Sequence, residues 1–321
     1  MTRERTLSRA RRSPAPKPYP LRYSSAPGIR AWTALPGRDQ ALLRWLLLGS
    51  VVTSDLAALL VYDSVRTARR RLSRLVAEGL LRGYWTANNQ RPRGRYAYGL
   101  LGPVRDALVA RLGQPGSRRG APAATGTIHQ LATHDLLAGF LRADPPAGSG
   151  LAKWLPERPL ANLFEEYLRP DALAIVAVPD GRVTMFIERD LGTEPTRVLV
   201  AKVVRYRTLL ARAGPVTTNL GIVVESRRRA ESLLTRLGPS IGDSPRVWLG
   251  VAADLVADPF VATWRDAGGD RRSTIELPRD PGPPDRVLGR LCLVEPDGLE
   301  AFEPDANHVP VLKPFIRHLR P

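Results

Sequence analysis

The chain has 321 residues, 43% of them hydrophobic, which is enough for two ordinary domains with buried cores and argues against wholesale disorder. It carries 48 lysines and arginines against 31 acidic residues, a formal net charge of +17, and this excess favours a polyanionic partner such as nucleic acid. No apolar run is long enough to span a bilayer, and no secretory signal or amphipathic anchor is visible, so a membrane partner is not expected. The single cysteine, Cys292, fits a reducing compartment, and we expect a cytoplasmic protein.

Two stretches without a hydrophobic period divide the chain. Residues 1–34 hold seven arginines and one lysine against one glutamate, with prolines interleaved, and predict a disordered basic arm. Residues 113–126 consist mostly of Gly, Pro, Ser, Arg and Ala and predict a linker. We therefore expect, after the arm, a DNA-binding domain at residues 35–115, an α/β domain at 127–252 and a loop-rich extension at 253–321.

The first domain has the element order of a winged helix-turn-helix. Helices are predicted at residues 38–49 and 55–60, the second capped by Thr53 or Ser54. A third helix begins after Asp63 or Ser64 and ends at Gly79. Two strands follow, at residues 80–85 and 95–100, and form a hairpin with a long polar tip. In a winged helix the third helix enters the major groove of DNA and the hairpin touches the backbone.

The third helix carries the clearest sign of a DNA contact. Its apolar side chains recur at three- and four-residue spacing, and arginines lie on the opposite face. Residues 64–95 hold nine arginines and a single acid, Glu78, whereas solvated helix faces usually mix both signs. We therefore favour double-stranded DNA as the partner over a merely solvated face or a protein contact. The expected DNA-binding residues are Arg66, Thr67, Arg70 and Arg74 on the helix and Arg91, Arg93 and Arg95 on the hairpin.

The second domain alternates helices and short apolar strands, which is typical of an α/β fold (α+β overall) with a sheet covered on both faces. The predicted order is helix 128–141, strands 151–155, 172–178 and 183–187, helix 195–213, strand 220–224, helix 226–237 and strand 247–251.

The hairpin in the middle of this domain brings carboxylates together. Asp180-Gly181 is a strong tight-turn signal, and a turn centred there places Asp171 opposite Asp190. Because side chains alternate along a strand, Asp171, Glu188 and Asp190 are predicted to project from one face. Their mutual repulsion requires a cation, a proton or a basic side chain at the same place.

A lysine is predicted to meet these carboxylates. Lys202 lies inside the apolar stripe of the helix at residues 195–213, next to Val203 and one turn before Tyr206. A lysine there needs a charged partner. Carboxylates that hold Mg or Mn, together with a lysine, suit metal-dependent cleavage of a phosphodiester. A structural cluster of ion pairs fits the same residues equally well.

The runs at residues 169–172 and 186–194, followed by Lys202 and Tyr206, resemble the actinobacterial replication-relaxation family, whose members are associated with plasmids and mobile elements. The resemblance extends from residue 35 to residue 252. It implies a winged helix ahead of a nuclease-like core of the PD-(D/E)xK type, with a mixed sheet built in the order αβββαβ.

The resemblance also implies roles for individual residues. Asp171 and Glu188 match the first and second acidic positions of such a core, whereas Asp190 stands where its lysine usually lies. Lys202, on the following helix, replaces that lysine. The expected catalytic residues are Asp171, Glu188 and Lys202, and the expected ligands of Mg or Mn are Asp171, Glu188 and Asp190. Accessory roles are expected of Glu157, Tyr206 and His129. A surface glutamate and a packed core histidine are the commoner alternatives for the first and last of these.

Two functions of different classes remain open. One is a DNA-processing protein of plasmid or mobile-element replication and transfer, which nicks or cleaves DNA with a metal. The other is a non-catalytic DNA-binding regulator or replication accessory that uses the fold as a scaffold, with other replication or conjugation proteins as partners. Metal-dependent nicking that is lost when Glu188 is changed separates the two. An RNA-binding protein is less favoured, because only 6% of the residues are aromatic and no stacking motif appears.

Overall fold

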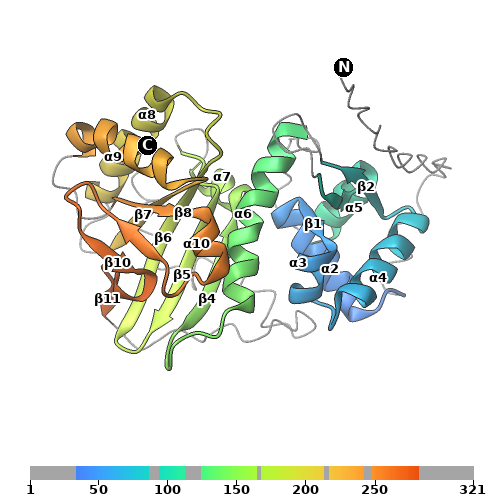
Figure 1. Ribbon diagram of the computed structural model, residues 1–321. Coiled ribbons are helices and arrows are strands. Elements are labelled where there is room, and N and C mark those ends of the chain that lie inside the picture. Colours follow the sequence, from blue (N-terminus) through green and yellow to red (C-terminus); the bar gives the residue numbers. More distant parts are fainter. Residues whose placement is uncertain are drawn as a thin grey trace, which may run out of the picture.

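The computed structural model describes residues 34–86, 94–112, 124–164, 168–212, 217–241 and 247–281. These residues form a mixed α/β structure with one sheet of three strands and one of eight (Figure 1). The fold class therefore agrees with the prediction. The basic arm except Ala34, most of the predicted linker, the hairpin arginines Arg91 and Arg93, and residues 282–321 lie outside the described residues. None of the helices in the described part is long and apolar enough to cross a membrane.

The N-terminal part contains the three predicted helices and the predicted hairpin. Its elements are α2 (Gly37–Gly49), β1 (Val51–Thr53), α3 (Ser54–Leu60), α4 (Val65–Ala77), β2 (Leu81–Trp85), β3 (Tyr96–Leu100) and α5 (Gly102–Leu112). The Thr53 hydroxyl accepts a hydrogen bond from the Leu56 amide, and the Ser64 hydroxyl accepts one from the Thr67 amide, so both predicted caps form. The short strand β1 was not predicted. It pairs with β3 and completes a sheet in the order β1-β3-β2, an arrangement consistent with a winged helix-turn-helix.

The C-terminal part is built on the eight-stranded sheet. Its strands are β4 (Gly150–Pro156), β5 (Ala172–Val178), β6 (Gly181–Asp190), β7 (Thr218–Val224), β8 (Val247–Val251), β9 (Thr263–Arg265), β10 (Arg271–Ser273) and β11 (Asp280–Pro281). Strands β4, β5 and β6 are antiparallel to one another, whereas β6, β7 and β8 run parallel. Parallel neighbours need a crossover, and helices supply it.

Helices cover both faces of this sheet. On one face α6 (Ala124–Arg142) and α10 (Ala252–Ala257) pack on side chains such as Val176 and Trp248. On the other face α7 (Glu157–Phe164), α8 (Thr196–Arg212) and α9 (Arg227–Ile241) pack on side chains such as Leu173 and Phe186. The order of α6, three antiparallel strands, α8 and β7 is the αβββαβ order that the sequence predicts. Helix α7 was not predicted, because it follows β4 without a break.

The β5–β6 hairpin turns one residue earlier than predicted, which shifts the pairing of the two strands by two residues. Val178 pairs with Gly181 and Ala172 pairs with Ile187, so Pro179 and Asp180 form the turn, not Asp180 and Gly181. The glycine serves a different purpose: β11 pairs with the start of β6, and a side chain at Gly181 would collide with the backbone of Asp280. The shift by two residues keeps every side chain on its predicted face. It moves Asp171 from the position opposite Asp190 to the end of the ladder beside Glu188.

The two parts pack against each other through α6, which runs between them (Figure 1). The ring of Trp45 on α2 meets the ring of His134 on α6 edge to face at 5.0 Å. Burial lowers the pKa of His134 to about 3, so this histidine is neutral at the contact. One continuous apolar cluster reaches from α2 and α4 to the large sheet. We conclude that α4 is held in a fixed position relative to the sheet.

Candidate functional site

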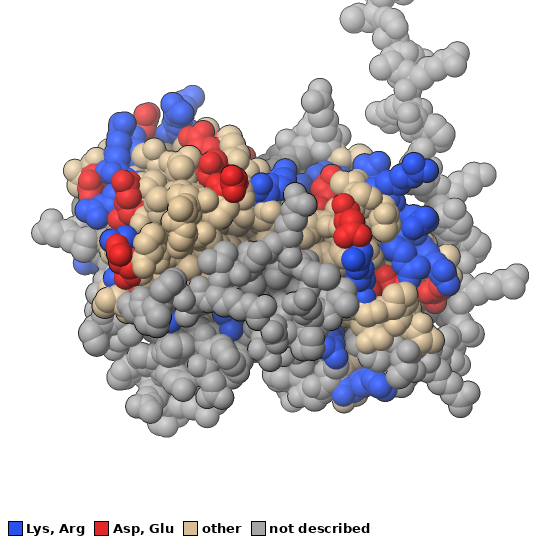
Figure 2. Space-filling model, turned by 90° about the horizontal axis from the view of Figure 1, so that it is seen from below, with Lys and Arg blue, Asp and Glu red and all other residues tan. Residues whose placement is uncertain are grey.

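Four exposed arginines form one face of α4. We define the arginine face as Arg66, Arg69, Arg70 and Arg74, whose side chains are all exposed. The opposite face of the helix is buried through Ala68, Leu72 and Leu75. In Figure 2, lysine and arginine side chains gather at the right-hand end of the molecule, the end that carries α4. The charge is thus concentrated on the side of the helix that faces solvent.

The structure separates the predicted DNA-binding residues into groups. Arg66, Arg70 and Arg74 lie on the arginine face, with Thr67 partly buried at its edge. The sequence reasoning missed Arg69, although it lies one turn after Arg66. Arg74 donates a hydrogen bond to Glu78 at 2.7 Å, an exposed pair one turn apart.

Arg95, which the sequence predicts to contact DNA from the hairpin, is paired within the protein. Its guanidinium makes two hydrogen bonds to the carboxylate of Asp135 on α6, at 2.6 and 3.1 Å. A two-point contact of this kind fixes the orientation of both side chains. Arg95 therefore ties the loop end of the hairpin to α6.

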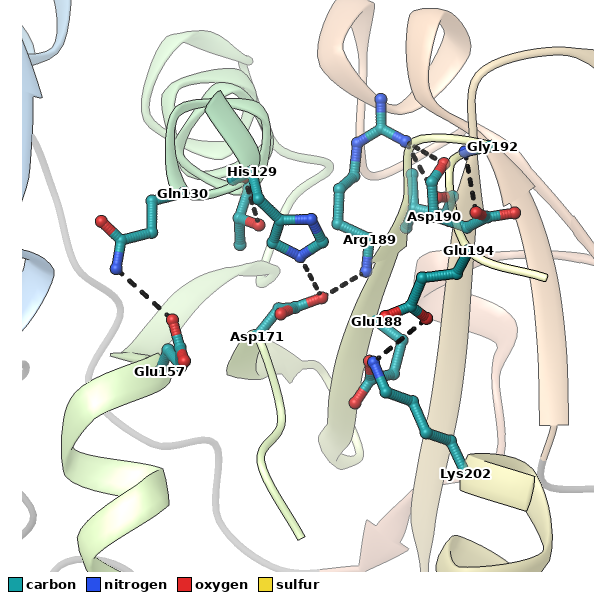
Figure 3. A network of polar contacts seen from close by, with 12 residues as sticks. His129, Gln130, Glu157, Asp171, Glu188, Arg189, Asp190, Gly192, Glu194 and Lys202 are labelled. Carbon is teal, nitrogen blue, oxygen red and sulfur yellow. Dashed lines mark hydrogen bonds and ion pairs between the residues drawn. The ribbon is translucent and has the colours of Figure 1, made fainter. Parts of the chain in front are cut away.

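The acidic residues predicted for catalysis lie where β5 begins and β6 ends. The amide of Asp171 donates to the Ile187 carbonyl at 3.1 Å, which places Asp171 at the end of the ladder. Its Oδ2 atom accepts hydrogen bonds from the Arg189 amide at 2.7 Å and from Nε2 of His129 at 2.8 Å (Figure 3). His129 reaches this position from the first turns of α6.

Glu188 is buried and held from α8. Its Oε1 atom accepts a hydrogen bond from the Tyr206 hydroxyl at 2.5 Å. Its Oε2 atom accepts one from Nζ of Lys202 at 3.1 Å, and Figure 3 shows Lys202 reaching toward Glu188 from α8. Only 3% of Glu188 is exposed. Lys202 also lies 3.6 Å from the carboxylate of Glu194. Asp171, Glu188 and Lys202 are thus brought to one place in the structure.

The charges at this place shift one another's proton affinity. Burial, together with the neighbouring charge of Asp171, raises the pKa of Glu188 to about 8. Burial alone would lower the pKa of Lys202, but the carboxylates around it outweigh that effect and raise its pKa above the ordinary value. Burial alone would also lower the pKa of His129, but the hydrogen bond to Asp171 and the charges of Asp171 and Glu188 together outweigh it and raise that pKa. Glu188 therefore holds its proton well into the neutral range, while Lys202 stays charged.

Asp190 does not join the other two carboxylates, contrary to the prediction that all three converge. Its Oδ2 atom accepts a hydrogen bond from Nε of Arg229 on α9 at 2.7 Å, and its Oδ1 atom accepts one from the Gly192 amide at 2.8 Å. Helix α9 follows β7, which pairs parallel with β6, and this crossover brings Arg229 to the end of β6. Within the described ranges, no group of three or more His, Cys, Asp or Glu side chains is arranged to hold a metal ion.

A small pocket opens beside Asp171. It is lined by residues of α2, α6 and the β4–α7 junction, among them His129, Gln130 and Glu157. The amide of Gln130 donates to Glu157 at 3.4 Å (Figure 3). Glu157 therefore lies at the pocket and not in contact with Glu188. Sequence reasoning missed Gln130, although its position next to His129 on α6 was the available signal.

The pH dependence of stability tests the buried carboxyl group. Because the pKa of Glu188 is higher in the folded chain than the ordinary 4.5, its contribution to stability is full below about pH 4.5 and is lost as the pH rises through about 8. Glu188→Gln removes this dependence, so the variant should gain about 2–4 kcal/mol of unfolding free energy relative to the parent chain across that window. Thermal melts at a series of pH values measure it. The exposed Glu231→Gln is the control, and parallel curves for Glu188→Gln and the parent would contradict the burial argument.

A protein-family model described as replication-relaxation matches residues 43–225. No curated protein and no solved structure matches the chain. The matched span runs from α2 to the residue after β7, so it includes the arginine face and the residues around Glu188. Because the match covers more than half of the 321 residues, this chain belongs to the replication-relaxation family.

Proposed function

We propose that this chain is a DNA-binding protein of plasmid or mobile-element replication, which places α4 in the major groove of double-stranded DNA. The family supports the role in replication. The observation that carries the proposal is the arginine face, four exposed cations on a helix whose other face is buried in the hydrophobic core. The hairpin beside α4 takes the part of the wing, which contacts backbone phosphates.

The position of α4 suits this role. Arg71, the neighbour of the arginine face, turns inward and forms a salt bridge with the buried carboxylate of Asp39 on α2. The helix is thereby fixed to the rest of the N-terminal part while the side chains of the arginine face stay exposed. Guanidinium groups bind guanine edges and phosphates through paired hydrogen bonds, so a rigid helix with several of them fits a groove lined by phosphates.

Salt dependence of binding tests the proposal. Fluorescence anisotropy with a labelled duplex is measured from about 50 to 200 mM salt, and the affinity should fall by at least about tenfold across that range because phosphate contacts release counterions. The same titration with heparin in place of DNA shows whether the affinity is specific to a duplex. Absence of duplex binding at low salt would refute the proposed function.

Nicking of DNA is a second candidate function, favoured by the convergence of Asp171, Glu188 and Lys202 on an αβββαβ core of the order found in PD-(D/E)xK nucleases. The donor set fits a metal site with two carboxylate ligands, because Mg²⁺ is commonly held by one or two carboxylates with water and substrate phosphates. Burial and the negative charge of Asp171 both raise the pKa of Glu188, and a bound cation would offset the repulsion between the two carboxylates. Asp171 and Glu188 would hold Mg²⁺ or Mn²⁺, which when bound neutralises phosphate charge and activates water.

The neighbouring side chains would position the two carboxyl groups and the phosphate in this candidate activity. His129 and the Arg189 amide fix the orientation of the Asp171 carboxylate through Oδ2. Tyr206 holds Glu188 from the buried side. Lys202 is about one third exposed, so its ammonium group can contact a phosphate while it remains near Glu188. Together they would place one exposed cation, Lys202, beside two carboxyl groups able to hold a metal ion.

Metal-dependent stabilisation and nicking test this candidate separately. Mn²⁺ at millimolar concentration should raise the melting temperature of the parent chain, because a ligand of the folded state stabilises it. Glu188→Ala should abolish the gain and the nicking of supercoiled DNA, whereas Lys202→Ala should keep the gain and lose at least about a hundredfold in nicking rate. The exposed Glu231→Ala serves as the control. No metal effect and no nicking by the parent chain would leave the non-catalytic role, a DNA-binding scaffold for other replication or conjugation proteins.

A further inference from the structure

Two aromatic side chains are exposed together on the hairpin next to α4. Trp85 at the end of β2 is 59% exposed, and Tyr96 at the start of β3 is 40% exposed. The two residues pair directly across the strands, so their side chains lie side by side on one face of the hairpin. We call Trp85 and Tyr96 the wing aromatics.

The ring of Tyr96 is held in place from two directions. It lies over Gly83, where an added Cβ would come within 2.6 Å of its Cζ atom, so only glycine leaves room for the ring. Its edge meets the ring of Tyr98 at a centroid distance of 5.1 Å and an interplanar angle of 75°. The ring is thus supported from below and from one side, while part of its surface remains open to solvent. A supported, exposed ring is suited to stack on a flat ligand.

The wing aromatics lie on the face of the hairpin that meets α4. Tyr98 lies on the same face of the hairpin. Its hydroxyl contacts Ser73 of α4 and interacts electrostatically with Arg69. The wing aromatics, one on each strand, therefore lie one step further along the hairpin than Tyr98, on the face that meets α4. A partner that contacts both the arginine face and the wing aromatics must be anionic and must contain flat apolar rings.

We propose that the wing aromatics stack on an unpaired base where a DNA duplex opens into single strands, while the arginine face holds the duplex beside it. This inference rests on the proposed DNA-binding function. Bases inside a duplex cover one another, so the exposed rings of a wing cannot stack on them, whereas the first unpaired base at a fork offers a free face. The protein would therefore bind a forked DNA in preference to a closed duplex.

Competition between a forked DNA and a blunt duplex of the same paired sequence tests the inference, with the full chain and anisotropy as the readout. The parent chain should bind the fork roughly fivefold or more tightly than the duplex, the effect of one base stacked on an aromatic side chain. Trp85→Leu and Tyr96→Leu should bring this ratio close to one, whereas Trp85→Phe, which keeps a ring, should retain most of it. A 2-aminopurine at the first unpaired position should be quenched by the parent chain and not by Trp85→Leu.

The control variant is Val261→Ala, which removes an apolar side chain that is 57% exposed on the C-terminal part and should leave the ratio unchanged. Equal affinity of the parent chain for fork and duplex would overturn the inference, as would a preference that survives Trp85→Leu. Self-association that is lost in Trp85→Leu, without a fork preference, would assign the patch to a protein contact instead. Duplex binding that depends on the arginine face would leave the proposed function standing in each of these cases, and no binding to either DNA would refute both.

Discussion

Alanine at Arg66, Arg70 and Arg74 together should weaken the binding of duplex DNA by about a hundredfold or more. Each of these side chains is exposed on one face of α4, and an arginine that contacts a base contributes about 1–3 kcal/mol, with less from one that contacts phosphate. None of the three packs in the core, because the buried face of the helix consists of other residues. The fold should therefore be unchanged, and anisotropy at constant salt measures the loss directly.

A matched control separates the position of the charge from its amount. Arg205, Arg228 and Arg271 are also exposed but lie on the C-terminal part, so changing these three to alanine lowers the net charge equally. This variant should lose less than about tenfold in affinity, since distant charges act mainly through the screened field of the molecule. Equal losses in the two triple variants would show that α4 has no special role. Among the single variants, Arg74→Ala should have the smallest effect, because Arg74 is already paired with Glu78.

The arginine face and its helix could be predicted from sequence because both depend on local periodicity. Leu72 and Leu75 fall at helical spacing, and Ser64 provides a cap within the same turn. The strand β1 escaped prediction since three residues between two helices show no alternation. The turn of the β5–β6 hairpin was misplaced because Gly181 is required by β11, a strand about one hundred residues away that no local pattern connects to it.

The candidate site was predictable only in part for the same reason. Lys202 could be recognised as a charged residue within an apolar stripe. Because such a lysine needs a carboxylate partner, its contact with Glu188 could also be predicted. Arg229 could not be foreseen as the partner of Asp190, because only the crossover through β7 brings α9 to the end of β6. The contact of His129 with Asp171 depends in turn on how α6 packs on the sheet. Contacts between residues far apart in the chain produce no periodic pattern in the sequence, so they could not be predicted from it.

Asp39→Ala should destabilise the chain by about 3–5 kcal/mol. The sequence gives no sign of this residue, yet Asp39 is fully buried on α2 and is the acceptor for two side chains. Its carboxylate forms a salt bridge with Arg71 of α4 and accepts a hydrogen bond from the Tyr62 hydroxyl at 2.7 Å. Removal of the carboxylate leaves a partly buried guanidinium and a buried hydroxyl without their acceptor, which costs the desolvation of the hydroxyl and part of that of the guanidinium. Chemical denaturation of the variant and the parent chain measures the difference.

The double variant Asp39→Ala with Arg71→Met shows whether the unpaired charge causes that loss. Methionine keeps much of the apolar stem of Arg71 and removes the guanidinium, so the double variant should recover about 2 kcal/mol or more relative to Asp39→Ala alone. DNA binding provides a second readout, because the same pair fixes α4 to α2. If the double variant regains stability but binds duplex more weakly than the parent chain, the salt bridge serves to orient the arginine face. A loss of less than about 1 kcal/mol in Asp39→Ala would instead mean that water replaces the carboxylate and that hydrophobic packing alone holds α4 in place.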